Sequence, residues 1–303
     1  MRALVTGAGG FVGSHLSARL VADGWEVVCA VRPGGRSARL AALGVEGAVE
    51  ILEADLSDRW ATAGAARAAD PDVAFLLAAR RAQDTPDERT ATAAVNASSA
   101  GWLVEALPER CRTVVRLGSS TEYAEVDGPT GEAAPLRPRG FFGATKAAGS
   151  LLFAAAAAER GLRAVLLRPF QVYGPLDHPG RLVPRALAAA RDGTVLPLTG
   201  AGRRRDWVFV DDVVEAAVGA ASAGELPAVL NLGTGRQVSN EELVAEIERV
   251  TGRAVKVDAG AHPGREWDTG SWVCDPSLAR RLLGWEAKVA LDDGLGRCWE
   301  WLR

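Results

Sequence analysis

The sequence is poor in several residue types, and each shortage excludes a kind of site. It has four cysteines, at positions 29, 111, 274 and 298, without a C-x-x-C pair, and three isolated histidines. This pattern lacks the ligand spacing of a metal site and fits free thiols in a reducing cytoplasm. A formal net charge of −3 supplies no basic field for nucleic acid. We therefore expect a cytoplasmic protein without a metal, whose partners are small molecules rather than nucleic acid.

Long hydrophobic runs are also missing. We find no run of about 18 apolar residues that could cross a membrane. Met1 leads directly into a strand-like segment at 3–5, and no signal-peptide pattern precedes it. Because 48% of the 303 residues are hydrophobic, the chain can bury a large core. We expect a globular fold without a membrane partner.

The first half of the chain alternates short β-branched runs with helical stretches, a pattern typical of a parallel sheet with crossover helices. After residue 167 the pattern becomes irregular, and Ser239 is the expected N-cap of a late helix. The predicted fold is α/β: a Rossmann-type doubly wound parallel sheet in residues 1–170, rejoined by about 205–235, with a smaller substrate-binding lobe in 171–303. Strands are expected at 3–6, 26–31, 49–53, 73–77, 113–117 and 164–167, and helices at 11–22, 90–106, 144–160, 211–221 and 240–250.

A glycine-rich turn, Thr-Gly-Ala-Gly-Gly-Phe-Val-Gly, follows the first predicted strand at residues 6–13. Glycines at these spacings permit a tight turn, a close approach to a pyrophosphate and close packing of helix on strand. The N-terminus of the next helix then faces the anion. A glycine turn alone can be purely structural, but its strand–turn–helix context predicts a dinucleotide site. The expected cofactor-binding residues here are Gly7, Gly9, Gly10, Phe11, Val12 and Gly13.

Cofactor choice is expected at the end of the second strand, where a carboxylate would bind a ribose 2′-hydroxyl and an arginine a 2′-phosphate. The sequence there ends on Arg32, with Arg36 and Arg39 close behind. Because a guanidinium can donate a pair of hydrogen bonds to phosphate oxygens, Arg32 favours NADPH/NADP. The other interpretation is that these arginines form a solvated surface of an arginine-rich chain.

Further motifs follow the nucleotide turn. They include Gly118-Ser119-Ser120-Thr121, Lys146 in a segment like Y-x-x-x-K, Arg168 to Pro175 in the pattern R-x-x-x-V-Y-G-P, and Arg205-Asp206-Trp207-Val208. In this order they resemble the extended short-chain dehydrogenase/reductase family, also called the epimerase/dehydratase family, over nearly the whole chain. The resemblance implies a catalytic role for Ser119, a ribose-binding role for Lys146, and a homodimer as partner. It also implies cofactor contacts from Asp55, Leu56, Leu77, Ala78, Ala79, Asn96 and Pro169.

The chain departs from this family at Phe142, where the Y-x-x-x-K segment should begin with tyrosine. In the family the phenol exchanges a proton with the substrate oxygen, and such help contributes about 10² to 10⁴ in rate. Phenylalanine cannot exchange a proton. The chain's two tyrosines, Tyr123 and Tyr173, fall inside other motifs.

Three interpretations of Phe142 are open. In the first, catalysis is lost and the chain is an NADP-binding sensor or scaffold. In the second, a nucleotide-sugar epimerase or 4-ketoreductase uses Ser119, Glu122 or His178 as a substitute acid. A 4,6-dehydratase is disfavoured, because Ser120 and Thr121 stand where such enzymes have an acidic pair.

The third interpretation, which we favour from the sequence, is an NADPH-dependent ketoreductase of antibiotic biosynthesis acting on an angucyclinone-like aromatic polyketide. Hydride attack creates an alkoxide, and a phenol beside the ketone can supply the proton within the substrate. Aromatic side chains would hold such a flat ligand, although core packing is the alternative for each of them. The expected substrate pocket consists of Phe142, Phe170, Gln171, His178 and Trp207, with Phe141 beside them.

Overall fold

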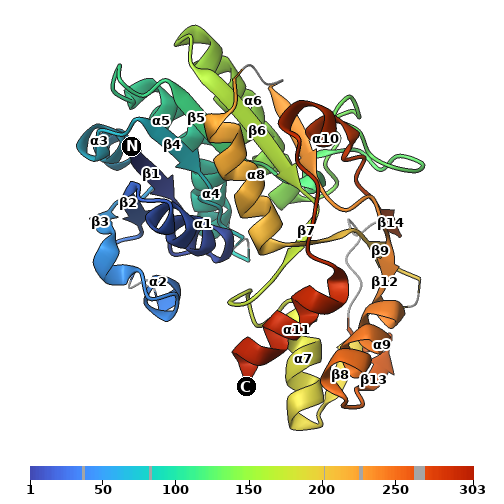
Figure 1. Ribbon diagram of the computed structural model, residues 1–303. Coiled ribbons are helices and arrows are strands. Elements are labelled where there is room, and N and C mark those ends of the chain that lie inside the picture. The colour runs from blue at the N-terminus through green and yellow to red at the C-terminus, as the bar shows by residue number, and fades with distance from the viewer. Residues whose placement is uncertain (36–37, 82–83, 201, 225–227, 263–269) are drawn as a thin grey trace. The chain divides into compact units, whose positions relative to one another are not determined.

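The computed structural model describes residues 1–35, 38–81, 84–200, 202–224, 228–262 and 270–303, which form two compact units (Figure 1). The first unit comprises Met1–Ala124, Pro135–Arg168 and Val214–Leu230. The second comprises Glu125–Ala134, Pro169–Val213 and Asn231–Arg303. The expected assignment of residues 1–170 to the cofactor and 171–303 to the substrate concerns function and stays a prediction.

A seven-stranded sheet forms the centre of the first unit. The strand order reverses between β1 and β4, and open parallel sheets bind ligands beyond the carboxyl ends of the strands at such a point. The pairs from β3 to β6 are all parallel. The predicted Rossmann-type fold is thereby confirmed. The order is β3 (Glu50–Glu53), β2 (Glu26–Val31), β1 (Arg2–Thr6), β4 (Val73–Leu76), β5 (Thr113–Leu117), β6 (Arg163–Pro169) and β11 (Val229–Leu232).

Helices cover both faces of this sheet (Figure 1). On one face, Arg19 of α1 and Glu215 of α8 form an ion pair with an Nη1–Oε2 distance of 2.5 Å. On the other face, α3, α5 and α6 pack side by side. Burial of the apolar side chains between helices and strands stabilises this arrangement. The bounds are α1 (Phe11–Ala22), α2 (Ala38–Ala42), α3 (Arg59–Ala69), α5 (Ser99–Ala106), α6 (Phe141–Glu159) and α8 (Val210–Ser222), with a 3₁₀ turn at Glu46–Ala48.

The helix expected at 90–106 starts earlier and is not uniform. It begins as α4 (Pro86–Ala93), continues through a π-helical turn at Ala94–Ser98 and ends as α5. Thr85 and Glu88 form a capping box at its start. This capping box lies before the apolar residues from which the helix start at residue 90 was expected, so the predicted start is too late.

Helix α6 is long and apolar enough to cross a membrane by length and composition alone. This differs from our expectation that no segment of the chain would be. Half of its most apolar window is buried within the protein, and α6 packs against α5. Core helices of soluble proteins have the same composition, so the finding is weak evidence for a membrane span.

The second unit consists, in its described residues, of small sheets around three packed helices. Its strands have two to four residues, which is too short for a recognisable sequence period. Ser239 caps α9 in a capping box with Glu242, as predicted. The paired strands are β7 (Gln171–Tyr173) with β10 (Trp207–Phe209), β8 (Val195–Leu198) with β13 (Lys256–Ala259), and β9 (Arg204–Arg205) with β12 (Val238–Ser239) and β14 (Ser271–Trp272). The packed helices are α7 (Leu182–Asp192), α9 (Asn240–Thr251) and α11 (Leu291–Leu302), and α10 (Ser277–Leu283) follows β14.

Candidate functional site

The glycine turn forms a cradle at the N-terminus of α1. Gly7 has a φ of +71°, a left-handed conformation that favours glycine. A Cβ on Gly7 would lie 2.8 Å from backbone atoms of Ala78, and one on Gly10 would lie 2.9 Å from the Gly7 carbonyl oxygen. Helix α1 has no side-chain cap, so its first N–H groups are directed at whatever ligand fills the cradle. This set of donors fits the pyrophosphate of a dinucleotide.

Basic side chains lie in the segment that follows β2. Arg32 follows β2 directly, and Arg39 donates from Nη1 to the carbonyl oxygen of Gly9 at 3.2 Å. Hydrogen bonds from Ser57 are the main reason that the pKa of Asp55 lies below its ordinary value, and the charges of Arg80 and Arg32 add to this effect. Arg32 and Arg39 thus lie near the glycine turn, where a 2′-phosphate could be bound. Arg36 lies outside the described residues.

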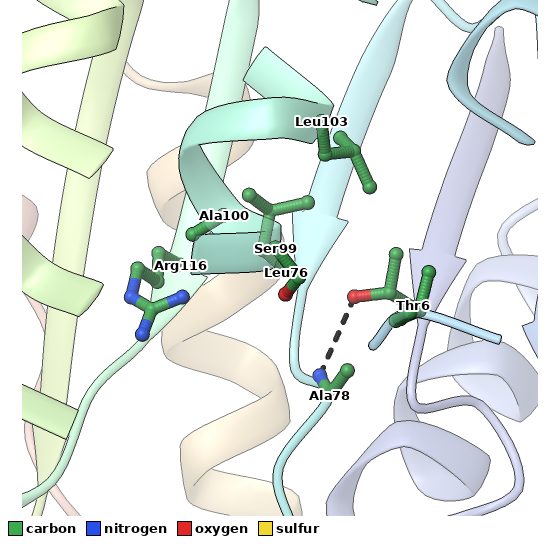
Figure 2. A pocket seen from close by; sticks show the side chains of 8 residues that line it. Thr6, Leu76, Ala78, Ser99, Ala100, Leu103 and Arg116 are labelled. Atoms are coloured by element: carbon green, nitrogen blue, oxygen red, sulfur yellow. Dashed lines mark hydrogen bonds between the residues drawn. The ribbon is translucent and has the colours of Figure 1, made fainter. Parts of the chain in front are cut away.

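A small cavity lies beneath the carboxyl ends of β1 and β4 (Figure 2). Its volume of about 10 Å³ suits a single water molecule and excludes a cofactor. Thr6 Oγ1 accepts a hydrogen bond from the Ala78 N–H at 3.3 Å, which ties β1 to the loop after β4. The cavity therefore belongs to the floor of the site. Its lining is Thr6, Leu56, Leu76, Ala78, Ser99, Ala100, Leu103 and Arg116.

Asn96, in the π-helical turn, holds the loop that follows β4. Its Nδ2 donates to the Arg80 carbonyl oxygen and to Thr145 Oγ1, both at 2.9 Å. Its Oδ1 accepts the Arg80 N–H at 2.8 Å. Because the amide is fully buried and bonded to protein groups, the predicted cofactor contact of Asn96 stays a prediction and would act through the segment that Asn96 positions. That segment contains the predicted contacts Leu77, Ala78 and Ala79.

Lys146 on α6 is almost fully buried, and its Nζ donates to the Leu117 carbonyl oxygen at the end of β5, at 2.6 Å. Burial, and after it the charge of Arg116, lowers the pKa of Lys146 to about 7, whereas the charge of Glu122 raises it. The amine therefore changes its protonation near neutral pH.

This lowered pKa predicts a pH-dependent stability. Between pH 7 and about 10.4 the unfolded chain keeps the Lys146 proton that the folded chain has released. Unfolding then takes up a proton, so the free energy of unfolding should rise with pH by at most about 1.4 kcal/mol per unit. Urea titrations of the cofactor-free protein should show this slope relative to Lys146→Met. The exposed Lys256→Met variant is the control, and an equal slope in wild type and Lys146→Met would contradict the assignment.

Ser119 follows β5 and caps the 3₁₀ turn at Ser120–Glu122. Its Oγ accepts hydrogen bonds from the Thr121 N–H at 3.2 Å and from Thr121 Oγ1 at 2.8 Å. Two accepted bonds direct the hydroxyl proton of Ser119 away from the turn. Ser119 can therefore donate to the oxygen of a ligand.

Glu122 is fixed in a buried ion pair, which argues against its use as a substitute acid. Its Oε1 accepts the Ser119 N–H and its Oε2 accepts Arg168 Nε, each at 2.8 Å. The Glu122 side chain is 0% exposed and that of Arg168 is 5% exposed. Both carboxylate oxygens are thus occupied by structural partners.

Neither tyrosine can replace the missing phenol. The Tyr123 ring is buried and covers the guanidinium of Arg168, 4.6 Å from the ring centre. Tyr173, in the second unit, is buried and donates to the Leu291 carbonyl oxygen at 3.3 Å. Burial raises the pKa of Tyr173 well above its ordinary value.

Phe142 lies in the first turn of α6, four residues before Lys146. The guanidinium carbon of Arg81 lies 4.1 Å from the centre of the Phe142 ring, and that of Arg89 lies 5.1 Å from the centre of the Phe141 ring. Both are cation–π contacts. From the sequence we expect these two rings in an apolar substrate pocket. No sequence pattern indicates that an arginine guanidinium would contact the face of each ring.

The other predicted pocket residues belong to the second unit. Phe170 and Trp207 are 7% and 6% exposed, and the Trp207 ring packs edge-on against Tyr173. Gln171 pairs with Trp207 across β7 and β10, and His178 Nδ1 accepts the Gly180 N–H at 3.1 Å. The contact of these residues with a substrate, and that of Pro169 with a cofactor, stay predictions.

Known proteins share this architecture over the whole chain. The profile of the NAD dependent epimerase/dehydratase family matches residues 3–233. A UDP-glucose 4-epimerase from Mycolicibacterium smegmatis is 33% identical, with 100% of this chain and 99% of the relative covered. The structure of MoeE5 in complex with UDP-glucose and NAD has a TM-score of 0.85 at 30% identity, covering 100% of this chain and 98% of that one.

A further solved structure is a tyrosine-to-phenylalanine mutant of UDP-glucuronic acid 4-epimerase from Bacillus cereus, in complex with UDP-4-deoxy-4-fluoro-glucuronic acid and NAD. It has a TM-score of 0.87 at 25% identity and covers 100% of this chain and 99% of that one. Two of these proteins are thus epimerases of nucleotide sugars, and both solved structures contain NAD together with a nucleotide sugar or its analogue.

Proposed function

Because this chain belongs to the NAD dependent epimerase/dehydratase family, we propose that it transfers hydride between a bound nicotinamide dinucleotide and a carbonyl or alcohol carbon of a nucleotide sugar. The observation that carries the proposal is the pair of Ser119 and Lys146. They place a hydroxyl donor and a buried amine beyond the carboxyl end of β5, at the same sheet edge as the glycine cradle. Full-length relatives that act on nucleotide sugars support this substrate class over the polyketide that the sequence alone favoured.

In the proposed reaction each group of the site has a separate role. The glycine cradle and the α1 N-terminus bind the pyrophosphate, and Lys146 binds the nicotinamide ribose. Ser119 donates a hydrogen bond to the reacting oxygen and positions it. The dinucleotide supplies or accepts the hydride when it is bound. Phe142 can contribute only its apolar ring, so the proton of the product alcohol comes from another source.

Phe142 favours a second candidate, the reduction of a ketone on an angucyclinone-like aromatic polyketide. A phenol beside that ketone has a pKa of about 10, close enough to neutral to deliver its proton as the alkoxide forms. Proximity within one molecule can replace a proton donor of the enzyme. This candidate would make the protein a ketoreductase of antibiotic biosynthesis.

One substrate panel tests both candidates. Nucleotide sugars, their 4-keto derivatives and hydroxylated aromatic ketones are screened for thermal stabilisation, for loss of NADPH or NADH absorbance and, because an epimerase consumes no net cofactor, for conversion of the sugar itself. Turnover confined to nucleotide sugars or their keto derivatives supports the first candidate. Turnover confined to aromatic ketones, lost when the neighbouring phenol is methylated, supports the second. Tight NADPH binding without turnover across the whole panel would contradict both and favour a sensor.

We also propose NADP(H) as the preferred cofactor, on the basis of Arg32. Arg32→Ala should weaken NADPH binding by roughly 10- to 100-fold, the contribution expected of hydrogen bonds to a charged phosphate. NADH affinity should change by less than about threefold, since NADH has no 2′-phosphate. Fluorescence titration measures both constants, with the half-exposed Arg59→Ala as control. Equal weakening of the two cofactors would remove Arg32 from the phosphate site.

We also propose a cytoplasmic location and a homodimeric state. All four cysteines are buried free thiols, in keeping with a cytoplasmic location. The family resemblance is the ground for a homodimer, which light scattering of the purified protein tests.

A further inference from the structure

We infer that Arg81 takes the place of the missing tyrosine hydroxyl: its guanidinium donates hydrogen bonds to the reacting oxygen of the substrate and stabilises the negative charge there. The inference rests on the proposed hydride transfer. Arg81 would be a further catalytic residue, and it lies in the loop after β4, where no sequence motif predicts a functional arginine.

The contact with Phe142 positions this guanidinium. The Arg81 guanidinium carbon lies 4.1 Å from the centre of the ring. A guanidinium on an aromatic face keeps its in-plane N–H groups directed outward, where they can bind an oxygen. Tyrosine would carry its hydroxyl on the edge of the same ring. Phe142 therefore acts as a platform that holds an arginine donor over its face, beside the position that the hydroxyl would occupy at its edge.

The electrostatic surroundings favour a negative charge on the bound ligand. Burial is the main cause of the lowered pKa of Lys146, and the charges of Arg116 and Arg81 both contribute to it. The Glu122 carboxylate raises that pKa, but its oxygens are bonded to Arg168 and to the Ser119 N–H. An oxyanion that forms beside Lys146 would thus meet the buried charge of Arg116 and the charge of the exposed Arg81, which the Phe142 ring positions.

Reduction of the carbonyl group does not require Arg81 to give up a proton. In the reducing direction the carbonyl carbon receives the hydride with its electron pair, the C=O π electrons move to the oxygen, and the dinucleotide is oxidised. N–H groups of Arg81 and the O–H of Ser119 bind the resulting oxyanion. Arginine keeps its protons at any pH that the protein tolerates. The proton that completes the alcohol comes from water or from a hydroxyl of the substrate itself.

The neighbouring Arg89 provides a matched control. Its guanidinium lies over Phe141, one residue before Phe142, at the longer distance of 5.1 Å. Arg89→Met removes a cation–π contact of the same kind at the start of the same helix. A purely structural role of such contacts would make Arg81→Met and Arg89→Met behave alike.

The first experiment measures kcat with the ketone that the substrate panel identifies. Arg81→Met should lower kcat by about 10²-fold, as expected when one oxyanion donor is removed. Arg81→Lys, which keeps the charge, should lie within about tenfold of wild type, and NADPH affinity should stay within about threefold in every variant. Arg89→Met should keep the wild-type kcat. Equal losses in Arg81→Met and Arg89→Met, or no loss in Arg81→Met, would overturn the inference.

The second experiment needs no turnover. 4-Nitrophenolate, an oxyanion with its own absorbance, is titrated into the NADP-bound protein at a pH where the free phenol is ionised. Arg81→Met should weaken its binding by at least about tenfold and Arg89→Met should not, since one fixed donor to an oxyanion has this effect. Unchanged binding in Arg81→Met, or none by wild type, would overturn the inference. Arg81→Gln, also uncharged, serves if Arg81→Met does not fold.

These two readouts separate the inference from the function on which it rests. If no compound of the panel is reduced, oxidised or otherwise converted, the proposed hydride transfer fails, whereas the 4-nitrophenolate titrations still decide whether Arg81 binds an oxyanion.

Discussion

Replacement of Glu122 by glutamine should lower the free energy of unfolding by about 3 kcal/mol or more, the usual cost of removing one partner from a buried ion pair. The carboxylate is fully buried and bonded to Arg168, whose side chain is 5% exposed. Its charge also acts on Arg116 and Lys146, which are 2% and 3% exposed. Glutamine keeps the shape of the side chain but leaves the buried guanidinium of Arg168 without a countercharge.

Urea denaturation measures this loss. Glu105→Gln is the control, because Glu105 is 54% exposed and its ion pair with Arg59 is 3.4 Å long. That change should alter the free energy of unfolding by no more than about 0.5 kcal/mol. A Glu122→Gln protein as stable as wild type would mean that the neighbouring cations are compensated elsewhere. Turnover should fall together with stability, because the Glu122 carboxylate also holds the turn that carries Ser119, the proposed donor to the reacting oxygen.

Some elements of the first unit could be predicted because they carry a complete local signal, whereas α2, α3 and β11 were not predicted. The β2 strand and α1 have the bounds expected from the sequence, since an apolar β-branched run and a glycine turn mark their limits. The helix at 90–106 was expected four residues too late. Its start depends on Thr85 and Glu88, which are polar and lie outside the apolar pattern.

The charged interior of the site could not be predicted in the same way. Arg116 lies in an otherwise apolar strand, and only the fold brings its Nη2 within 2.8 Å of the Asn96 carbonyl oxygen. Glu122 could be read as a free acid in the sequence, because its partner Arg168 lies 46 residues away. Arg81 follows another arginine in an arginine-rich chain. Its contact with Phe142 depends on how the loop after β4 meets α6, which no local pattern encodes.

The substrate class could not be predicted from the sequence motifs. The favoured polyketide hypothesis followed from one residue, Phe142, and from aromatic residues assumed to form a pocket. Phe170 and Trp207 are buried in the second unit, and the named relatives are enzymes of nucleotide sugars. A missing catalytic group thus constrains how a proton is delivered more firmly than it identifies the molecule that receives the hydride.

Replacement of Gly13 by alanine should abolish dinucleotide binding, with at least a 10²-fold rise in the dissociation constant, an estimate of roughly 3 kcal/mol in binding free energy. A Cβ at this position would overlap the Gly7 carbonyl oxygen and lie 2.8 Å from the Gly7 carbonyl carbon. Both are backbone atoms, so a side chain cannot rotate out of the way. Either α1 moves off the sheet or the turn at Gly7 opens, and each change disperses the N–H groups that bind the pyrophosphate.

Gly64→Ala is the matched control, because Gly64 lies in α3 and a Cβ added there would meet no atom within 4 Å. Alanine is the better helix former, so Gly64→Ala should keep NADPH affinity and raise stability by up to about 1 kcal/mol. Isothermal titration with NADPH and thermal unfolding measure the two effects together. If Gly13→Ala bound NADPH like wild type, the cofactor would have to lie away from the glycine turn. That result would also contradict the proposed binding of the 2′-phosphate by Arg32 and of the nicotinamide ribose by Lys146. Loss of binding in a folded Gly13→Ala protein would instead support the glycine turn between β1 and α1 as the dinucleotide site.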